Sequence, residues 1–317
     1  MLAAALIAIT APAAAPAAAS STGPVHRTHL LVSGLDGAVG STVGPDGALY
    51  VAESAAGRIS RVDPRTGRTT TFASGLPRRI LDTGGAMDVA FVHHRAYVLV
   101  TLVGPDVGGR DVDGIYRVDG PDRVTVVADI GAWSVAHPPA SAFFVPTGVQ
   151  YALQPYRGGF LVTDGHHNRL LRVTLGGDIT ERATFGNVVP TGIATRDRTV
   201  YLAQAGPVPH DPSDGRVVRV ESRSGRTVEV ASGAPLLVDV EFGRDRRLYA
   251  LSQGHFTPGN PEGSPADPAT GALVLVNRDG IMTPVAEGLD RPTSLEFIRT
   301  TAYVVTLTGE IWTIDGR

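Results

Sequence analysis

The chain has 317 residues, of which 43% are hydrophobic and 19% charged, and its formal net charge at pH 7 is -3. This balance is typical of a globular protein and gives no reason to expect nucleic acid or an anionic membrane surface as a partner. The absence of cysteine excludes disulfides, thiolate metal ligands and cysteine nucleophiles. The 38 glycines and 23 prolines indicate many turns, as a chain of short strands requires.

The N-terminal segment 1–19, MLAAALIAITAPAAAPAAA, is uncharged and rich in alanine. An apolar run followed by small residues is typical of a secretory signal peptide with an A-x-A cleavage site. The run is too short and too often broken by proline for a transmembrane helix. We therefore expect a secreted protein with a signal peptide at 1–19, a short linker at 20–26 and one folded domain at 27–317.

The folded part repeats one pattern, which is clearest in VGPDGALYVAESAAGRISRVDPRTGRTTTFASGL at 43–76. Each unit alternates short β-branched or aromatic runs with Gly, Asp or Pro turns, which predicts four antiparallel strands. No segment has a sustained 3.6-residue apolar period, so no helix is expected. Four strands repeated in six units predict an all-β fold, a six-bladed β-propeller. The matching landmarks of the units are Tyr50, Tyr97, Leu161, Tyr201, Tyr249 and Tyr303.

The last unit is incomplete, because it ends after its third strand, EIWTI at 310–314. An unpaired strand, RTHLLVSGL at 27–35, precedes the first unit. An open blade would leave a strand edge exposed, which favours aggregation. We therefore expect the N-terminal strand to complete the last blade and close the ring.

The blade motifs LYVAES…GRISRVD and LVTDGHHNRLLRV (161–173) resemble NHL-type blades of six-bladed, TolB-like propellers. The order of further features, VPTG (145–148), SGAPLLVDVEFGRDRRLYALSQG (232–254) and GLDRPTSLEF (288–297), resembles the ScyD/ScyE family of exported propellers. The resemblance covers about residues 27–317 and implies the fold and export more than an activity. The second unit departs from the pattern, since VHHRAYVLV replaces the usual hairpin sequence there.

Long insertions occur at 103–114, 131–146, 205–215 and 254–271. In a propeller these connections lie on one end of the ring, the upper face, while the other end carries tight turns. Long loops on a rigid scaffold commonly bind ligands, but exposed loops also diverge without a function. Aromatic side chains on these loops are expected either to line an apolar pocket or to cover the blade tops: Phe143, Phe144 and Phe256.

The first strands, once aligned, direct one residue per blade toward the central channel: Ser41, Asp88, Gly148, Gly192, Asp239 and Ser294. Blades two and five are opposite in a six-fold ring, so we expect Asp88 and Asp239 to face each other. Like charges in a confined space raise at least one pKa or bind a cation. In the alternative interpretation, each carboxylate binds a neighbouring backbone amide or an ordered water.

The ends of the second strands align another set: Glu53, Val100, Asp164, Gln204, Ser252 and Thr306. Carboxylate and amide oxygens suit Ca²⁺ or Mg²⁺, so Glu53, Asp164 and Asp239 are the candidate metal ligands. The candidate ligand-binding residues at the channel mouth and on the upper loops are Glu53, Asp88, Asp164, His166, Gln204, Asp239, Gln253 and His255. The stretch DVDG at 111–114 resembles a fragment of a calcium loop, but the remaining acidic positions are missing and a solvated turn is expected.

Motifs of several enzyme classes are absent, namely G-x-S-x-G, the Walker loop, G-x-G-x-x-G and H-E-x-x-H. The first functional hypothesis is therefore a monomeric, exported binding scaffold that engages a small molecule or a protein on its upper face. The alternative is a metal-assisted hydrolase, similar to lactonase propellers, with a divalent cation at the channel mouth. A structural cell-envelope protein without a ligand is the third hypothesis.

Overall fold

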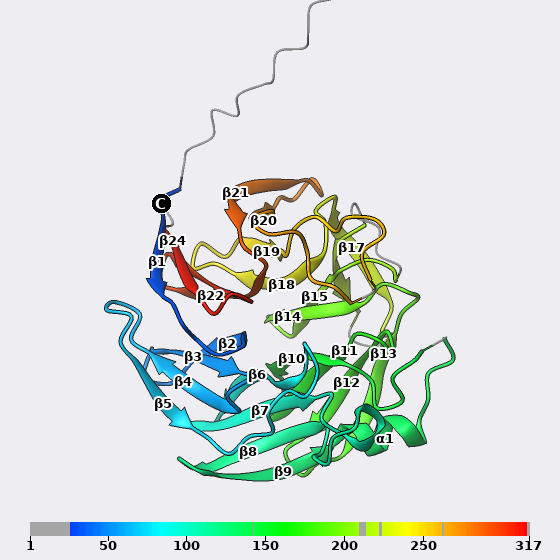
Figure 1. The fold of residues 1–317 in the computed structure, drawn as a ribbon. Coiled ribbons are helices and arrows are strands. Elements are labelled where there is room, and N and C mark those ends of the chain that lie inside the picture. The colour runs from blue at the N-terminus through cyan, green and yellow to red at the C-terminus, as the bar shows by residue number, and fades with distance from the viewer. Residues whose placement is uncertain (1–25, 142, 209–213, 222–223, 262, 316–317) are drawn as a thin grey trace, which may run out of the picture.

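The computed structural model describes residues 26–315 apart from 142, 209–213, 222–223 and 262. The expected signal peptide therefore lies outside the described residues. Six four-stranded antiparallel sheets surround a common axis, and this confirms the predicted six-bladed β-propeller (Figure 1). The first strand of each blade lies at the centre and contacts the first strands of both neighbouring blades, so the inner strands form a closed ring.

In the first five blades the strands follow chain order from the centre to the rim. The strands of blades one to three are β2 (Ala38–Val43), β3 (Leu49–Glu53), β4 (Arg58–Val62), β5 (Thr69–Ala73), β6 (Gly85–Val92), β7 (Arg95–Thr101), β8 (Gly114–Gly120), β9 (Arg123–Asp129), β10 (Gln150–Pro155), β11 (Gly159–Asp164), β12 (Arg169–Thr174) and β13 (Ile179–Thr184). Those of blades four and five are β14 (Pro190–Arg196), β15 (Thr199–Gln204), β16 (Arg216–Val220), β17 (Thr227–Ser232), β18 (Leu237–Phe242), β19 (Leu248–Ser252), β20 (Gly271–Val276) and β21 (Met282–Leu289).

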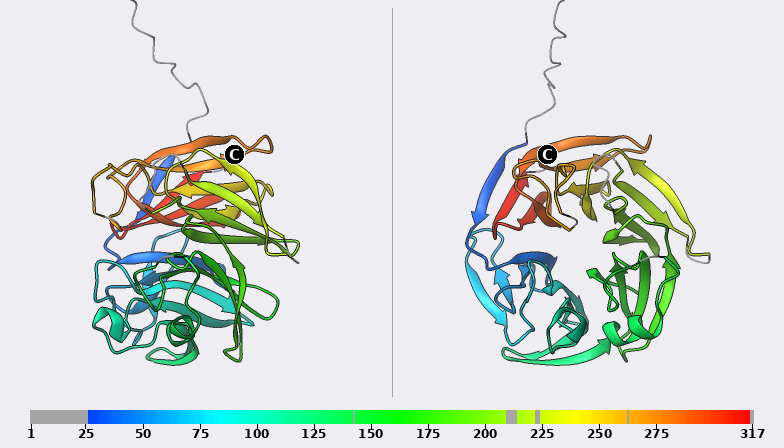
Figure 2. Two further views of the ribbon diagram at one scale, coloured as in Figure 1. Left: turned by 90° about the vertical axis from the view of Figure 1, so that its right-hand side faces the viewer. Right: turned by 45° about the vertical axis from the view of Figure 1, so that its right-hand side comes forward.

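The sixth blade contains strands from both ends of the chain. Its three inner strands are β22 (Pro292–Ile298), β23 (Thr301–Thr306) and β24 (Ile311–Asp315), and its rim strand is β1 (Thr28–Val32). β1 pairs antiparallel with β24, and Figure 2 shows it along the outer side of the C-terminal strands. Val32 and Leu35 are buried in a cluster with Ile311 and Val51, so this strand also contacts the core next to blade one.

Hydrophobic clusters lie between the blades. Each of the six interfaces between neighbouring blades contains one such cluster; for example, Tyr50 of blade one packs with Val98 of blade two. This follows from the strand pattern, because side chains alternate between the two faces of each sheet and both faces meet a neighbour. A separate, smaller cluster under the upper loops contains Phe256 with Leu236, so Phe256 belongs to a loop core.

Every inner strand contains a β-bulge, where its register with the second strand shifts. A bulge adds a residue and redirects the side chains that follow it. The register therefore corrects two of the six expected channel positions, because Gly40 and Ala152, rather than Ser41 and Gly148, are equivalent to Asp88. The corrected set is Gly40, Asp88, Ala152, Gly192, Asp239 and Ser294.

The sequence pattern did not predict two short helical segments on the upper face. The α-helix α1 (Ile130–Ala136) is capped by the Asp129 side chain, which accepts a hydrogen bond from the Ala132 amide at 2.8 Å, and a 3₁₀ turn covers Pro105–Val107. Seven residues give too few turns for a visible apolar period, which is why α1 was missed. No helix in the described part of the chain is long and apolar enough to span a membrane.

Candidate functional site

Glu53 and Asp164 end equivalent second strands, and each lies opposite an arginine at the start of the third strand. Glu53 is fully buried and accepts hydrogen bonds from Nε and Nη2 of Arg58 at 2.9 and 2.8 Å, from Ser60 Oγ, and from the Asp36 amide at 2.7 Å. Burial opposes ionisation, but the hydrogen bonds from Arg58 and Ser60 hold the pKa of Glu53 below its usual range. Both oxygens of Glu53 are thus engaged within the protein.

Asp164 belongs to a buried polar network centred on Arg169, which is fully buried. The guanidinium donates to Asp164 Oδ2 at 3.1 Å, to His167 Nδ1 and Ser134 Oγ at 2.8 Å each, and to the His137 carbonyl oxygen at 2.8 Å. His167 Nε2 contacts the Val145 carbonyl oxygen at 2.9 Å, which places the ring proton on Nε2. The network therefore fixes α1 and the segment after it onto blade three.

The segment fixed in this way forms one wall of a cavity of about 410 Å³ on the upper face. Phe144 is 66% exposed and its ring lies 4.3 Å from that of His166, while Phe143 packs edge-on against His167 at 5.0 Å. We call this cavity the upper pocket. Its lining residues are Ser141, Phe143, Phe144, Gly165, His166, Asn168, Asn187, Val189 and Val208. Of the predicted ligand-binding residues, His166 lines it.

The opposite wall of the upper pocket is held by two asparagines. Asn168 Oδ1 accepts hydrogen bonds from the Val188 and Val189 amides, both at 2.9 Å. The Asn187 side chain bonds the backbone of Val208 in both directions, at 2.7 and 3.0 Å. These bonds join the turn between β11 and β12, the connection from blade three to blade four, and the loop between β15 and β16. The upper pocket is therefore formed before any ligand arrives.

The remaining predicted upper-face residues lie elsewhere. Gln253 Oε1 accepts a hydrogen bond from the Ala266 amide at 3.0 Å and so braces the long loop after β19. His255 is exposed on that same loop, and Gln204 is buried at the end of β15, opposite Arg216. None of the three lines the upper pocket.

The three predicted metal ligands are not brought together. Glu53, Asp164 and Asp239 belong to blades one, three and five. Among the residues that the structure describes, no three acidic or histidine side chains form a group that could hold a metal ion. We therefore derive no step through a metal at the channel mouth.

Asp88 and Asp239 occupy the channel and link neighbouring blades. Asp88 Oδ2 accepts from the Leu153 amide of blade three at 2.7 Å, and Asp239 Oδ2 accepts from the Leu295 amide of blade six at 2.7 Å. The second oxygen of each accepts from the next residue of its own strand at 2.8 Å. These bonds match the interpretation in which each carboxylate binds neighbouring backbone amides. Burial raises the pKa of Asp239 to about 7 and that of Asp88 well above its usual range, and the Asp239 charge adds to the rise for Asp88.

Tyr151 crosses the channel from blade three to blade six, where its hydroxyl donates to the Thr293 carbonyl oxygen at 3.1 Å. Burial raises the pKa of this phenol, and the charges of Asp239 and Asp88 add to the effect. Beside Tyr151 lies a cavity of about 280 Å³, which we call the channel pocket. Its lining follows the inner strands from the bulges to residues such as Val43 and Pro155, next to the tight turns of the lower face.

Two further acids, Glu241 and Glu296, line the channel pocket with Asp88 and Asp239. Burial raises the pKa of Glu241 to about 8, and burial with the neighbouring Glu241 charge raises that of Glu296. Neither glutamate was among the channel residues predicted from the sequence. The signal was available in VDVEF and TSLEF, where each glutamate follows the aligned channel residue by two positions and so points to the same side of the strand.

Comparison with known proteins places this chain among six-bladed propellers. Neither a protein-family model nor a curated protein matches the sequence. Among solved structures, a gluconolactonase from Xanthomonas campestris is similar with a TM-score of 0.63 and 13% identity over 92% of this chain and 90% of that one. A virginiamycin B lyase from Staphylococcus aureus gives 0.54 and 15%, covering 92% and 98%. The PQQ-bound aldose sugar dehydrogenase from Streptomyces coelicolor gives 0.58 and 13%, covering 92% and 98%. These likenesses concern the fold.

Proposed function

We propose that the protein is an exported, monomeric binding propeller of the ScyD/ScyE type, which holds a small aromatic or apolar molecule in the upper pocket. The observation that carries this proposal is the exposure of Phe144 over a formed cavity of about 410 Å³. A single exposed apolar side chain is common on protein surfaces, but Phe144 also lines a formed cavity, and aromatic anchors in such positions dominate many binding sites. Polar contacts hold both walls in place, so little entropy is lost on binding.

The ligand chemistry follows from the lining. Phe143 and Phe144 offer aromatic faces, and His166 and Ser141 place polar groups at the same cavity. This combination suits a planar ring that carries a hydrogen-bonding substituent. Alternatively, a protein partner could insert an aromatic side chain into the upper pocket. In that case small aromatic molecules would show no saturable binding, and only the protein partner would form a stable complex.

The test uses the dye 1-anilinonaphthalene-8-sulfonate, an aromatic probe whose fluorescence rises in apolar cavities. We expect saturable binding to the full chain, and Phe144→Ala should weaken it at least about tenfold, or ~1.4 kcal/mol. The matched control is Ile281→Ala, because Ile281 is exposed to 60% on the rim of blade five. If both variants bind the dye as the unmodified protein does, the upper pocket is not the binding site.

A second candidate is a hydrolase that acts in the channel pocket, as lactonase propellers suggest. It is favoured by two carboxyls, Asp239 and Glu241, whose pKa values of about 7 and 8 would let them exchange protons near neutral pH. The gluconolactonase similarity makes glucono-lactone the first substrate to test. Acid release that is lost in Glu241→Gln would support this candidate, whereas an equal rate in that variant would exclude it.

A further inference from the structure

Another group of acidic side chains lies in blade two, outside both pockets described above. The loop 102–113 between β7 and β8 faces α1 across a cavity of about 530 Å³. Four aspartates line this cavity: Asp106, Asp111, Asp113 and Asp129. Acidic residues close together on a loop do not by themselves make a binding site. The contacts of each carboxylate oxygen decide whether a cation fits between them.

Asp113 is 2% exposed, which contradicts the solvated turn expected for the DVDG stretch. Its Oδ1 accepts a hydrogen bond from the Val103 amide at 2.8 Å. Its Oδ2 is buried and has no hydrogen-bond partner among the residues that the structure describes. Thr147 lies beside it, but the single hydroxyl proton of Thr147 goes to Asp106 Oδ2 at 2.8 Å. A buried carboxylate oxygen without a donor is costly, and the protein retains one here.

Asp106 presents its free oxygen to the same point. Its Oδ2 accepts from the Thr147 amide and hydroxyl, at 3.3 and 2.8 Å, which leaves Oδ1 directed elsewhere. A Cβ atom built on Gly104 would lie 3.1 Å from Asp106 Oδ1 and 2.9 Å from Asp113 Oδ2. The two oxygens therefore converge on the space beside Gly104 that a side chain would fill.

We propose that Asp106 and Asp113 bind one hard divalent cation beside Gly104, with water completing its coordination. Carboxylate oxygens are the ligands that Ca²⁺ and Mg²⁺ prefer, and Ca²⁺ accepts irregular geometry more readily than Mg²⁺ does. The irregular backbone of this loop therefore favours Ca²⁺ over Mg²⁺. The site is separate from the metal position predicted at the channel mouth.

The local charges support this assignment. Burial raises the pKa of Asp113; the Val103 amide and the neighbouring Thr147 hydroxyl offset part of this rise, and the charges of Asp106 and Asp129 add to it. The nearest cation on the loop, Arg110, is exposed and makes no ion pair with these aspartates within the described residues. A bound cation would remove the repulsion between the carboxylates and give the unpartnered Asp113 oxygen a partner.

The experiment titrates the full chain, freed of metal with a chelator, with CaCl₂, MgCl₂ or NaCl in a calorimeter. We expect one saturable Ca²⁺ site with a Kd on the order of 10⁻⁴–10⁻³ M, weaker Mg²⁺ binding and no saturation with Na⁺. Gly104→Ala should weaken Ca²⁺ at least about tenfold. Gly104 has φ -79° and ψ 175°, so alanine is compatible with its backbone and the added methyl acts on the site. Asp122→Asn, an exposed aspartate in the same blade, is the matched control and should bind as the unmodified protein does.

A second readout distinguishes the cation from a protonated carboxyl. Asp113→Asn keeps an oxygen for the Val103 amide and removes the buried charge. In chelator this variant should melt at a higher temperature than the unmodified protein, and it should lose the rise in melting temperature that Ca²⁺ gives. The proposal is overturned if the unmodified protein binds no Ca²⁺, if Gly104→Ala binds it equally well, or if Asp113→Asn leaves the Ca²⁺ effect intact.

Discussion

Replacing Arg169 with methionine tests the buried network that holds the upper pocket. The substitution keeps an unbranched apolar stem but removes the guanidinium and its donors to Asp164, His167, Ser134 and the His137 carbonyl oxygen. Asp164 would remain fully buried and lose its ion pair with Arg169. Removing one member of a buried ion pair costs about 3–5 kcal/mol, because the other charge is left without compensation.

The measurement is the free energy of unfolding from urea titration, with the dye titration of the upper pocket beside it. We expect Arg169→Met to lose about 3–5 kcal/mol and to weaken dye binding, since the Phe143–Phe144 segment loses its anchor. Arg58→Met is the matched control from the equivalent position of blade one. The Arg58 side chain is 37% exposed, so water can reach the gap and the loss should be smaller. A loss below about 1 kcal/mol for Arg169→Met would refute the anchoring role.

Three further predictions concern the ring and its channel. Gly192→Ala should destabilise the protein by about 1–3 kcal/mol in urea unfolding, because a Cβ there would lie 2.5 Å from Asp239 Cα; an unchanged midpoint would contradict the close packing of these blades. The pKa of Glu241 is about 8 in the folded protein against an ordinary 4.5, so the native state binds the proton more tightly than the unfolded state does. The free energy of unfolding should therefore fall as the pH rises between these values. Glu241→Gln should reduce this fall, as measured by urea unfolding across this pH range. Cysteines at His29 and Thr313, which are paired across β1 and β24, should form the only disulfide and add about 2–4 kcal/mol, an effect that reduction reverses; failure to oxidise would argue against this register.

The fold could be predicted from the sequence because each blade has the same local pattern of strand-forming and turn-forming residues. The aligned landmarks, five tyrosines and Leu161, indicated the number of blades, and the incomplete last unit pointed to the strand before the first one. α1 could not be found in this way, since IGAWSVA is shorter than the pattern that identifies a helix. Its stability comes from the Asp129 cap and from burial of Ile130 against blade two, which are tertiary features.

The candidate sites were predictable only in part. Alignment placed Asp88 and Asp239 in the channel correctly, but the bulges moved two other positions by one or more residues, and a bulge leaves no clear mark in the sequence. Glu241 was visible in the repeat and was overlooked. The upper pocket depends on contacts between residues far apart in the chain, such as Asn187 with Val208, which no local pattern reports. Asp113 looked like a surface turn because its burial is caused by the neighbouring helix and Thr147.

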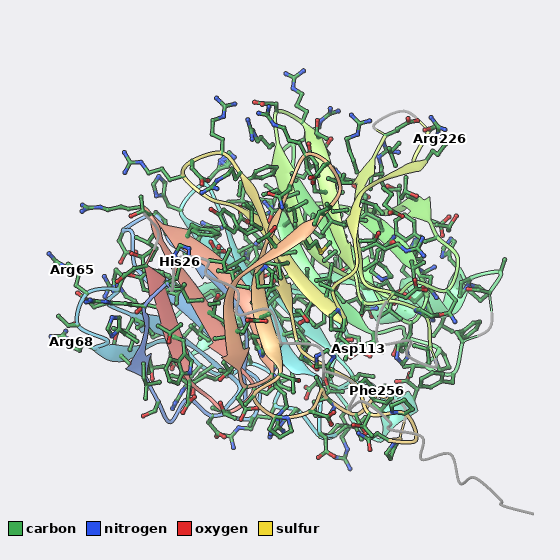
Figure 3. The ribbon with its side chains drawn as sticks, turned by 90° about the horizontal axis from the view of Figure 1, so that it is seen from above. His26, Arg65, Arg68, Asp113, Arg226 and Phe256 are labelled. Atoms are coloured by element: carbon green, nitrogen blue, oxygen red, sulfur yellow. The ribbon has the colours of Figure 1, made fainter. Side chains whose placement is uncertain are left out.

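The ring leaves exposed arginines such as Arg65 and Arg226 projecting at its edge, while Asp113 lies within the body of the molecule (Figure 3).

The phenol of Tyr151, which reaches from one side of the ring to the other, has a consequence for both ends of the molecule. A solute that enters the channel from the lower face, with its tight turns, meets the ring of Tyr151 before it can reach the loops of the upper face. The upper pocket and the channel pocket have no lining residue in common, so the loops above can be redesigned for a new ligand while the carboxyls in the channel keep their own proton affinity.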